Sequence, residues 1–69
     1  MKLVITFHTT TQAMAMEALC QKENLPGRLI PLPGVVSAGC GLCWCAPIEE
    51  EERLKSQEIE YDRIYHVMI

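Results

Sequence analysis

Two prolines stand two residues apart in a segment that otherwise has the composition of a β-strand. The segment is Arg28-Leu29-Ile30-Pro31-Leu32-Pro33. In an extended strand the backbone N–H groups of residues i and i+2 point toward the same neighbour, and proline has no N–H to donate. One side of this strand therefore cannot pair. We predict an edge strand whose other side pairs with the rest of a sheet, and whose prolines discourage edge-to-edge association.

The rest of the chain divides into strand and helix patterns. Residues 2–8 are rich in β-branched and aromatic side chains and predict a central strand. Three threonines that can cap a helix precede a run of good helix formers. The expected elements are strands at 2–8, 28–33, 40–45 and 61–68, and helices at 12–23 and from Pro47 to Lys55.

Each predicted helix has a face for the core. In the first helix, Ala13, Met16 and either Leu19 or Cys20 recur at the three- and four-residue spacing of a buried stripe. The second helix is expected to begin on a proline and to carry a run of glutamates in its first turn, where carboxylates favour the helix dipole. Its core-facing residues are expected to be Ile48 and Leu54.

The order strand, helix, strand, strand, helix, strand predicts a fold of the α+β class. A chain of 69 residues is too short for two domains, so residues 1–69 are expected to form one. Two βαβ halves with right-handed crossovers give a ferredoxin-like βαββαβ two-layer sandwich, with a four-stranded antiparallel sheet and both helices on one face. That topology places the second strand at an edge, in agreement with the two prolines.

Charge and hydropathy exclude several partners. Six basic residues against nine acidic ones give a net charge of −3, and the basic residues are scattered. Nucleic-acid binding needs a clustered basic face, so we expect no nucleic-acid partner. No apolar run approaches the ~18 residues of a membrane span, and the first apolar stretch has no cleavage site after it. We therefore expect no membrane insertion and a cytoplasmic location, where thiols stay reduced.

Three of the four cysteines, Cys40, Cys43 and Cys45, lie within six residues. They could ligate a metal, since Cys-x-x-Cys is half of a typical zinc signature, but the chain offers no second ligand pair. Cys40 and Cys43 could instead form a redox dithiol. The helix that normally activates such a motif is missing, however, and an extended backbone holds the thiols too far apart. We expect no cofactor, with these two chemistries as alternatives.

Cys40 can also act alone, because it stands between two glycines. Gly39 and Gly41 let the backbone approach a ligand closely and can present consecutive N–H groups, a geometry that stabilises a thiolate or its anionic product. A persulfide or selenopersulfide carrier needs an exposed thiol of this kind. The alternative from the same residues is a glycine-shaped turn in which Cys40 is a small buried residue.

The other thiols are expected to be packing residues. Cys20 lies on the apolar side of its helix, and Cys43 and Cys45 are expected to be buried under the helices. Leu42 and Trp44 would then occupy the opposite face of the sheet. An exposed Trp44 there would indicate a partner surface.

The two histidines carry weaker signals. His8, at the end of the first strand, could act as a base for Cys40 or be an ordinary strand-end histidine. His66 lies at the far end of the chain and has no motif around it.

Two motifs resemble a known family. Pro26-Gly27-Arg28-Leu29-Ile30-Pro31-Leu32-Pro33 and, after it, Ser37-Ala38-Gly39-Cys40-Gly41-Leu42 are similar to small bacterial domains of unknown function described as putative selenium/sulfur carrier protein-like. The resemblance continues through 14–17 and 61–65, and Ser-x-x-Cys-Gly is its most specific part. It implies that Cys40 is the carrier cysteine and that Ser37, Gly39 and Gly41 shape its loop.

The chain also departs from the family pattern. Many members carry a basic residue where Gly34 stands, which leaves Arg28 as the nearby charge that could stabilise an anion. Cys43 and Cys45 occupy positions where we expect ordinary apolar residues in most relatives. They are either core thiols or an addition that makes a dithiol or metal site.

The functional hypothesis is a cytoplasmic sulfur or selenium carrier, expected to be a homodimer. Cys40 would hold sulfane sulfur or reduced selenium between a donor protein, such as a cysteine desulfurase, and an acceptor protein. The alternatives are a thiol-rich metal-binding or dithiol redox module and a non-catalytic protein-interaction domain, because small sandwiches with an open sheet face commonly serve as docking modules.

Overall fold

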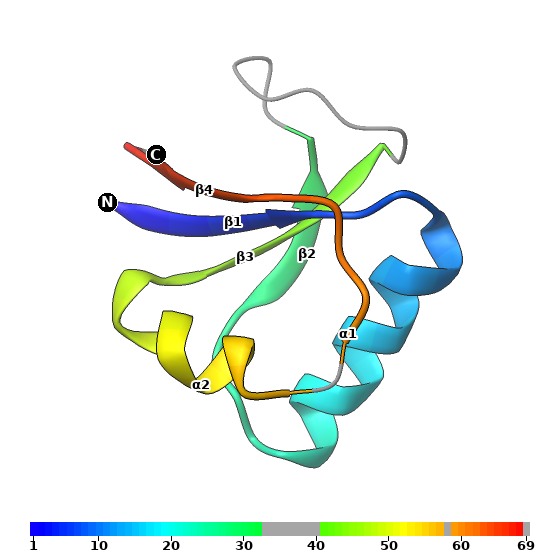
Figure 1. The fold of residues 1–69 in the computed structure, drawn as a ribbon, viewed down its shortest axis with the longest axis horizontal. Helices are drawn as coiled ribbons and strands as arrows, with labels where there is room; N and C mark the ends of the chain where they lie inside the picture. Colours follow the sequence, from blue (N-terminus) through cyan, green and yellow to red (C-terminus); the bar gives the residue numbers. More distant parts are fainter. Residues whose placement is uncertain (33–40, 58, 69) are drawn as a thin grey trace.

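The computed structural model describes residues 1–32, 41–57 and 59–68. They form β1 (Lys2–Thr6), α1 (Thr10–Lys22), β2 (Arg28–Pro31), β3 (Leu42–Pro47), the 3₁₀ turn η1 (Ile48–Glu50), α2 (Glu51–Lys55) and β4 (Ile64–Val67) (Figure 1). The strands make one antiparallel sheet in the order β2-β3-β1-β4, and both helices lie on the same side of it. This is the predicted α+β two-layer sandwich with ferredoxin-like strand order.

β1 is a central strand, as its composition predicts. On one side it pairs with β3 from Lys2, opposite Pro47, to Thr6, opposite Cys43. On the other side it pairs with β4. Both partners come from later in the chain, so the middle of the sheet depends on non-local pairing.

β2 lies at an edge of the sheet, as the two prolines predict. Pro31 is opposite Leu42, and the N–H of Leu32 donates to the carbonyl oxygen of Gly41 at 3.0 Å. Since successive N–H groups of a strand point to opposite sides, the nitrogen of Pro31 faces away from β3. The lost donor therefore lies on the unpaired side. Pro33 falls outside the described residues.

One apolar core fills the space between the sheet and the helices. The predicted stripe of α1 is confirmed for Ala13, Met16 and Cys20, and Leu54 is buried from α2. Burying a large aliphatic or aromatic side chain stabilises the fold by about 1.5–3 kcal/mol relative to leaving it in water. The core consists of Leu3, Ile5, Phe7, Ala13, Met16, Cys20, Leu25, Trp44, Ala46 and Leu54.

The start of α1 follows from its cap. The Thr9 hydroxyl accepts a hydrogen bond from the N–H of Gln12 at 3.2 Å, so the helix begins at Thr10 rather than at residue 12. α1 has 13 residues, and no helix of the described segments is long and apolar enough to cross a membrane.

The prediction for the two faces of β3 is wrong. Trp44 is only 2% exposed and belongs to the core under the helices, and Leu42 packs against that core. Cys43 and Cys45 therefore lie on the opposite face. The reason is the register: Ile5 faces the helices and is opposite Trp44, and opposed residues of an antiparallel pair share a face. Trp44 consequently offers no exposed partner surface.

The predicted helix at Pro47 is also corrected. Pro47 is the last residue of β3, opposite Lys2, with the extended φ and ψ of −60° and 142°. β3 thus runs two residues later than predicted at both ends, and the helical segment after it is the turn η1 followed by the short α2. The central strand β1 and the edge strand β4 are shorter than predicted as well.

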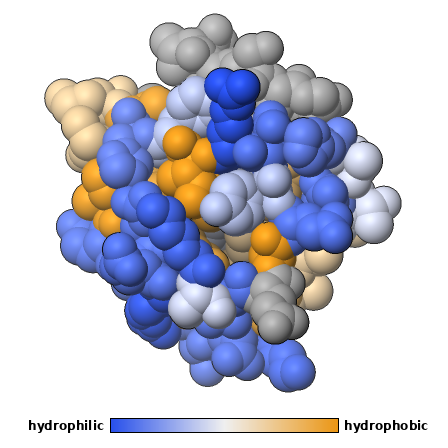
Figure 2. All heavy atoms as spheres, viewed as in Figure 1, coloured by the Kyte–Doolittle hydropathy of each residue, from blue (hydrophilic) through white to orange (hydrophobic). Residues whose placement is uncertain are grey.

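Figure 2 shows that the face seen in this view is mostly hydrophilic. Hydrophobic residues reach the surface in its middle and on the left, the side where both chain ends lie in Figure 1. Exposed large apolar side chains include Met1 and Met68, near the two chain ends, and Met14 on α1.

Candidate functional site

Most of the predicted thiol site falls outside the described residues. The structure does not describe residues 33–40, which include Ser37, Gly39 and Cys40. The interpretation of these three residues therefore rests on the sequence alone. Gly41 is described: it is exposed, lies at a bend before β3 and accepts the hydrogen bond from Leu32. A Cβ at Gly41 would meet no described atom within 4 Å.

Gly41 lies at the end of the sheet where β1 stops. The last pair between β1 and β3 joins Thr6 to Cys43. His8 follows Thr6 by two residues and Gly41 precedes Cys43 by two, and the strands are antiparallel. Both residues therefore lie beyond the same end of the sheet. The chain enters β4 at this end too, because the N–H of Asp62 donates to the carbonyl oxygen of Thr6 at 2.7 Å.

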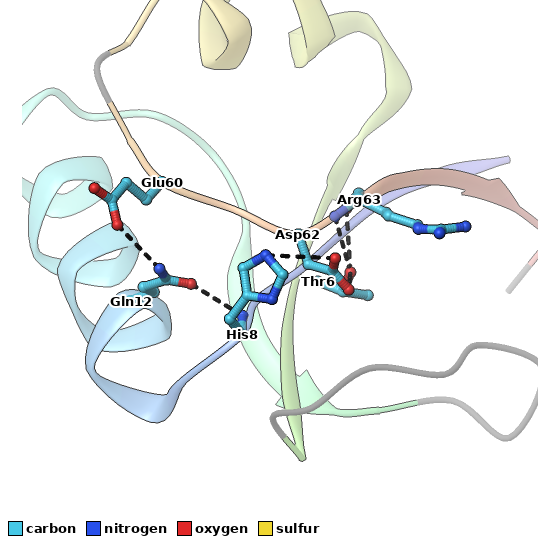
Figure 3. A network of polar contacts seen from close by, with 6 residues as sticks. All are labelled: Thr6, His8, Gln12, Glu60, Asp62 and Arg63. Atoms are coloured by element: carbon cyan, nitrogen blue, oxygen red, sulfur yellow. Dashed lines mark hydrogen bonds and ion pairs between the residues drawn. The ribbon is translucent and has the colours of Figure 1, made fainter.

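A polar network occupies this end of the sheet (Figure 3). His8 Nε2 lies 3.6 Å from Asp62 Oδ1, and the Thr6 hydroxyl lies 3.4 Å from Asp62 Oδ2. Thr6 is fully buried, and its hydroxyl also accepts from the N–H of Arg63 at 3.1 Å. The buried Thr6 hydroxyl therefore has hydrogen-bond partners, and these bonds connect the segment before β4 to the end of β1.

A second set of contacts holds the same loop from α1. The side chain of Gln12 accepts from the N–H of His8 at 2.9 Å and donates to Glu60 at 3.1 Å (Figure 3). The backbone at His8 is therefore held by the first turn of the helix, while its ring lies beside Asp62. Through Thr6, His8 and Gln12, the end of β1 and the start of α1 are connected to the distant segment 60–63.

Arg28 does not lie beside Gly41. It is opposite Cys45, whereas the Gly41 end of the hairpin is marked by the pair Pro31 and Leu42. Three residues of strand span about 10 Å. Arg28, Cys45 and Lys2 instead line a shallow hollow of about 280 Å³ toward the other end of the sheet.

His66 has a different setting from His8. Its Nε2 lies 2.8 Å from Glu51 Oε1, and Lys55 approaches the other oxygen of Glu51 at 3.0 Å. The hydrogen bond from Lys55, followed by that from His66, holds the pKa of Glu51 below its usual value. This cluster joins α2 to β4 on the helix side of the sheet.

The predicted packing role of Cys20 is consistent with its surroundings. It is buried in the core, and its thiol lies 3.6 Å from the sulfur of Met16. Burial raises the pKa of the Cys20 thiol to about 11. A thiol in this environment is a poor nucleophile, because the thiolate is the reactive form.

Metal binding by Cys40, Cys43 and Cys45 remains an alternative from the sequence. Cys43 and Cys45 share one face of β3, with Cα atoms about 6.6 Å apart as expected for residues i and i+2 of a strand. Within the described part of the chain, no three His, Cys, Asp or Glu side chains come together as a metal site.

A wider groove of about 700 Å³ lies between α1 and the segment that follows α2. Ala15, Leu19 and Ile59 give it an apolar lining. Among its described lining residues Glu60 is the only ionisable one, and Glu60 is already hydrogen bonded to Gln12. We assign this groove no chemistry.

Asp62, Gln12 and Glu60 were not among the predicted site residues. Their contacts to Thr6 and to one another span about 50 residues of sequence, which no local motif reveals. One signal was present: Thr6 is a hydroxyl residue in a strand that is otherwise apolar enough to be central. A buried hydroxyl needs a polar partner, which Asp62 and Arg63 supply.

Comparison with known proteins gives one match. The family model described as Putative Se/S carrier protein-like matches residues 2–66. No curated protein and no solved structure is detectably similar to the chain. Since the matched region covers almost all of the 69 residues, the chain belongs to the Putative Se/S carrier protein-like family.

Proposed function

We propose that this protein is a carrier of sulfane sulfur or reduced selenium and that Cys40 holds the cargo. The family match over residues 2–66 is the observation that carries the proposal. The Ser37-to-Gly41 motif supports Cys40 as the thiol, because it combines one cysteine with two glycines.

The chemical step is a transfer between thiols. The Cys40 thiolate attacks the terminal sulfur of a donor persulfide, R–S–SH. The bond between the two donor sulfurs breaks, the donor leaves as the thiolate R–S⁻, and Cys40 becomes a persulfide. The donor sulfur is reduced as Cys40 is oxidised, so no further oxidant is needed. An acceptor thiol or nucleophile later removes the atom by the same exchange.

The remaining parts of the proposal concern setting and partners. The protein works in the cytoplasm as a homodimer and meets a donor and an acceptor protein in turn. Arg28 lies on β2 opposite Cys45, whereas the pair of Pro31 and Leu42 marks the Gly41 end of the hairpin. We therefore assign Arg28 the weaker role of contributing positive charge to the surface that an anionic cargo approaches.

Mass spectrometry of the intact protein tests the carrier role. After incubation with a cysteine desulfurase and cysteine, wild type should gain about 32 mass units per transferred sulfur, located on Cys40 by peptide mapping. Cys40→Ser should gain none, while the matched control Cys45→Ser should gain the same as wild type. An unmodified wild type, or an adduct that persists in Cys40→Ser, would overturn the proposal.

A further inference from the structure

We propose that the hollow beside Cys45 binds a small anionic disulfide and that Cys45 forms a mixed disulfide with it. We call this place the Cys45 hollow and define it by four of its lining residues, Lys2, Gly27, Arg28 and Cys45. The ligand class is a low-molecular-weight disulfide that carries carboxylates. The inference goes beyond the carrier role, because that role assigns Cys45 no part.

The first step of the argument is the position of the thiol. Cys45 lies on the face of the sheet opposite the helices, since its neighbour Trp44 packs in the core. Cys45 is partly exposed, whereas Cys20 and Cys43 are buried. Among the three cysteines that the structure describes, Cys45 is therefore the one that a solute can reach.

The second step is the charge beside the thiol. Arg28 is opposite Cys45 in the β2–β3 pair, so the two side chains share a face with their Cβ atoms about 4.5–5.5 Å apart. On the other side of β3, Val4 is opposite Cys45, and Lys2 precedes Val4 by two residues. Lys2 is therefore a diagonal neighbour of Cys45, at about 7–8 Å. Two exposed cations from different strands thus flank one thiol.

Neither of these cations is neutralised by a described neighbour. Lys2 and Arg28 take part in no ion pair with a described residue, whereas Arg53 and Lys55 are paired with glutamates at 2.9 and 3.0 Å. The described lining of the hollow contains no acidic residue. Although the chain has a net charge of −3, the field at the Cys45 hollow is positive and attracts anions.

The third step is an unpaired donor at the wall of the hollow. Trp44 is 2% exposed, and its Nε1 has no hydrogen-bond partner among the described residues, although buried donors normally have one. A Cβ on Gly27 would lie 2.5 Å from this nitrogen, and Gly27 lines the hollow. Only a residue without a side chain therefore separates the indole N–H from the ligand space. A carboxylate bound there brings acceptor oxygens to this donor.

These features together define the class of ligand. A partly exposed thiol reacts with an electrophilic sulfur, and two unpaired cations together with an indole N–H favour carboxylate oxygens. The hollow has a volume of about 280 Å³, at the small end of the range for ligand sites. It suits a small molecule better than a segment of another protein. A peptide-sized disulfide with carboxylates meets all of these conditions.

The chemical step is thiol–disulfide exchange. Cys45 loses its proton to water, and its thiolate attacks one sulfur of the disulfide R–S–S–R. The bond between the two ligand sulfurs breaks, one half leaves as R–S⁻ and takes a proton from water, and the other half stays bound as Cys45–S–S–R. The ligand disulfide is the oxidant, so the step needs no other. A reducing thiol reverses it by the same exchange.

The test compares the rates at which two disulfides react with Cys40→Ser, in which Cys45 is the one cysteine that is not buried. Glutathione disulfide is anionic and 2-hydroxyethyl disulfide is neutral, and mass spectrometry of the intact protein follows both adducts. At low salt, adding Arg28→Gln should lower the rate with glutathione disulfide about threefold, and Lys2→Gln about twofold. The rate with the neutral disulfide should change less than about 1.5-fold in either variant.

Arg63→Gln is the matched control for charge. It removes one positive charge at the other end of β1, where the backbone of Arg63 is bonded to Thr6. It should leave both rates unchanged, and Cys45→Ser should abolish both adducts. An equal loss in Arg28→Gln, Lys2→Gln and Arg63→Gln would overturn the proposal, because the attraction would then come from the net charge of the chain. An adduct that persists after Cys45→Ser would also overturn it.

The indole resonance of Trp44 tests where the carboxylates lie. Trp44 is the single tryptophan of the chain, so ¹⁵N-labelled protein gives one indole N–H signal in NMR spectra. The glutathione adduct of Cys45 should shift this signal downfield, and the 2-hydroxyethyl adduct, which has no carboxylate, should shift it less. Equal shifts in the two adducts would contradict a ligand carboxylate beside Gly27.

Discussion

The indole nitrogen of Trp44 lies directly against the backbone of Gly27. A Cβ placed on Gly27 would be 2.5 Å from Trp44 Nε1 and 2.8 Å from the carbonyl oxygen of Cys45. Gly27 also has a φ of +134°, which side chains rarely adopt. The turn into β2 is therefore built around a missing side chain, and the core tryptophan fills the space.

Gly27→Ala should destabilise the fold because the new methyl group can avoid neither Trp44 nor the backbone of β3. We expect the free energy of unfolding to fall by about 1–3 kcal/mol. Urea denaturation followed by tryptophan fluorescence measures it. Gly41→Ala is the matched control, since no described atom lies within 4 Å of its Cβ position, and should change stability by less than about 0.5 kcal/mol. Equal stability of Gly27→Ala and wild type would contradict this account.

Trp44 is buried, yet its Nε1 has no hydrogen-bond partner among the described residues. Trp44→Phe removes this unsatisfied donor together with part of the ring, so the two effects oppose each other. We expect it to cost about 1–2 kcal/mol of unfolding free energy, against about 3–5 kcal/mol for Trp44→Ala. Chemical denaturation followed by circular dichroism suits both variants. If Trp44→Phe and Trp44→Ala lower the unfolding free energy by similar amounts, the indole N–H has a hydrogen-bond partner in solution.

Cys20 should resist alkylation in the folded protein. With the pKa of its thiol raised to about 11, roughly one molecule in a thousand carries the thiolate at about pH 8, and the core also blocks the reagent. Iodoacetamide labelling with peptide mapping should leave Cys20 unmodified under native conditions and label it fully in urea. Cys45, which is partly exposed, is the internal comparison. Native labelling of Cys20 as fast as of Cys45 would refute the prediction.

Glu51 should make stability depend on acidic pH. Lys55 and then His66 hold its pKa below the usual 4.5. A lowered folded-state pKa stabilises the fold above the unfolded-state value, and this contribution is lost as pH falls through the folded-state pKa. The stability difference between wild type and Glu51→Gln should therefore be present near neutral pH and shrink on acidification below about pH 4.5. Thermal unfolding across pH measures it.

The matched control for Glu51 is Glu49→Gln, because Glu49 is exposed in the neighbouring turn η1. It should change stability little at any pH. A pH-independent difference between wild type and Glu51→Gln would show that the carboxylate has no charged partner in solution.

Arg28→Ala should leave sulfur loading of Cys40 nearly unchanged, because Arg28 is opposite Cys45 and not at the Gly41 end of β3. We expect less than about a twofold change in rate at physiological salt, where exposed charges are screened beyond roughly 8 Å. Loading kinetics by mass spectrometry provide the measurement. A tenfold loss would place the Arg28 guanidinium in contact with the cargo.

The order of the strands could be predicted from sequence, because two prolines mark an edge and the element order allows few topologies. Which face of β3 packs on the helices could not be predicted from sequence. Residues 42–45 are apolar at every position, so their alternation defines two faces without indicating which one packs on the helices. The pairing of Trp44 with Ile5 decides this, and such a register is a property of the whole sheet.

The candidate site divides in the same way. Cys40 and its glycines form a local motif and are visible in the sequence. The contact between His8 and Asp62 is not visible in the sequence, because it depends on how the chain returns to the end of β1 before β4. Local patterns identify a candidate thiol such as Cys40, whereas a contact such as that of His8 with Asp62 joins distant segments and leaves no local pattern.

The central position of β1 has a consequence for how the protein acquires its fold. The first strand has no sheet partner until β3 forms, and β4, which begins at Ile64, completes its other side. Only the β2–β3 hairpin can assemble from neighbouring sequence. Long loops must therefore close before most of the stabilising contacts form, so folding should be slow for a domain of this size. The sheet should also form and melt as one cooperative unit.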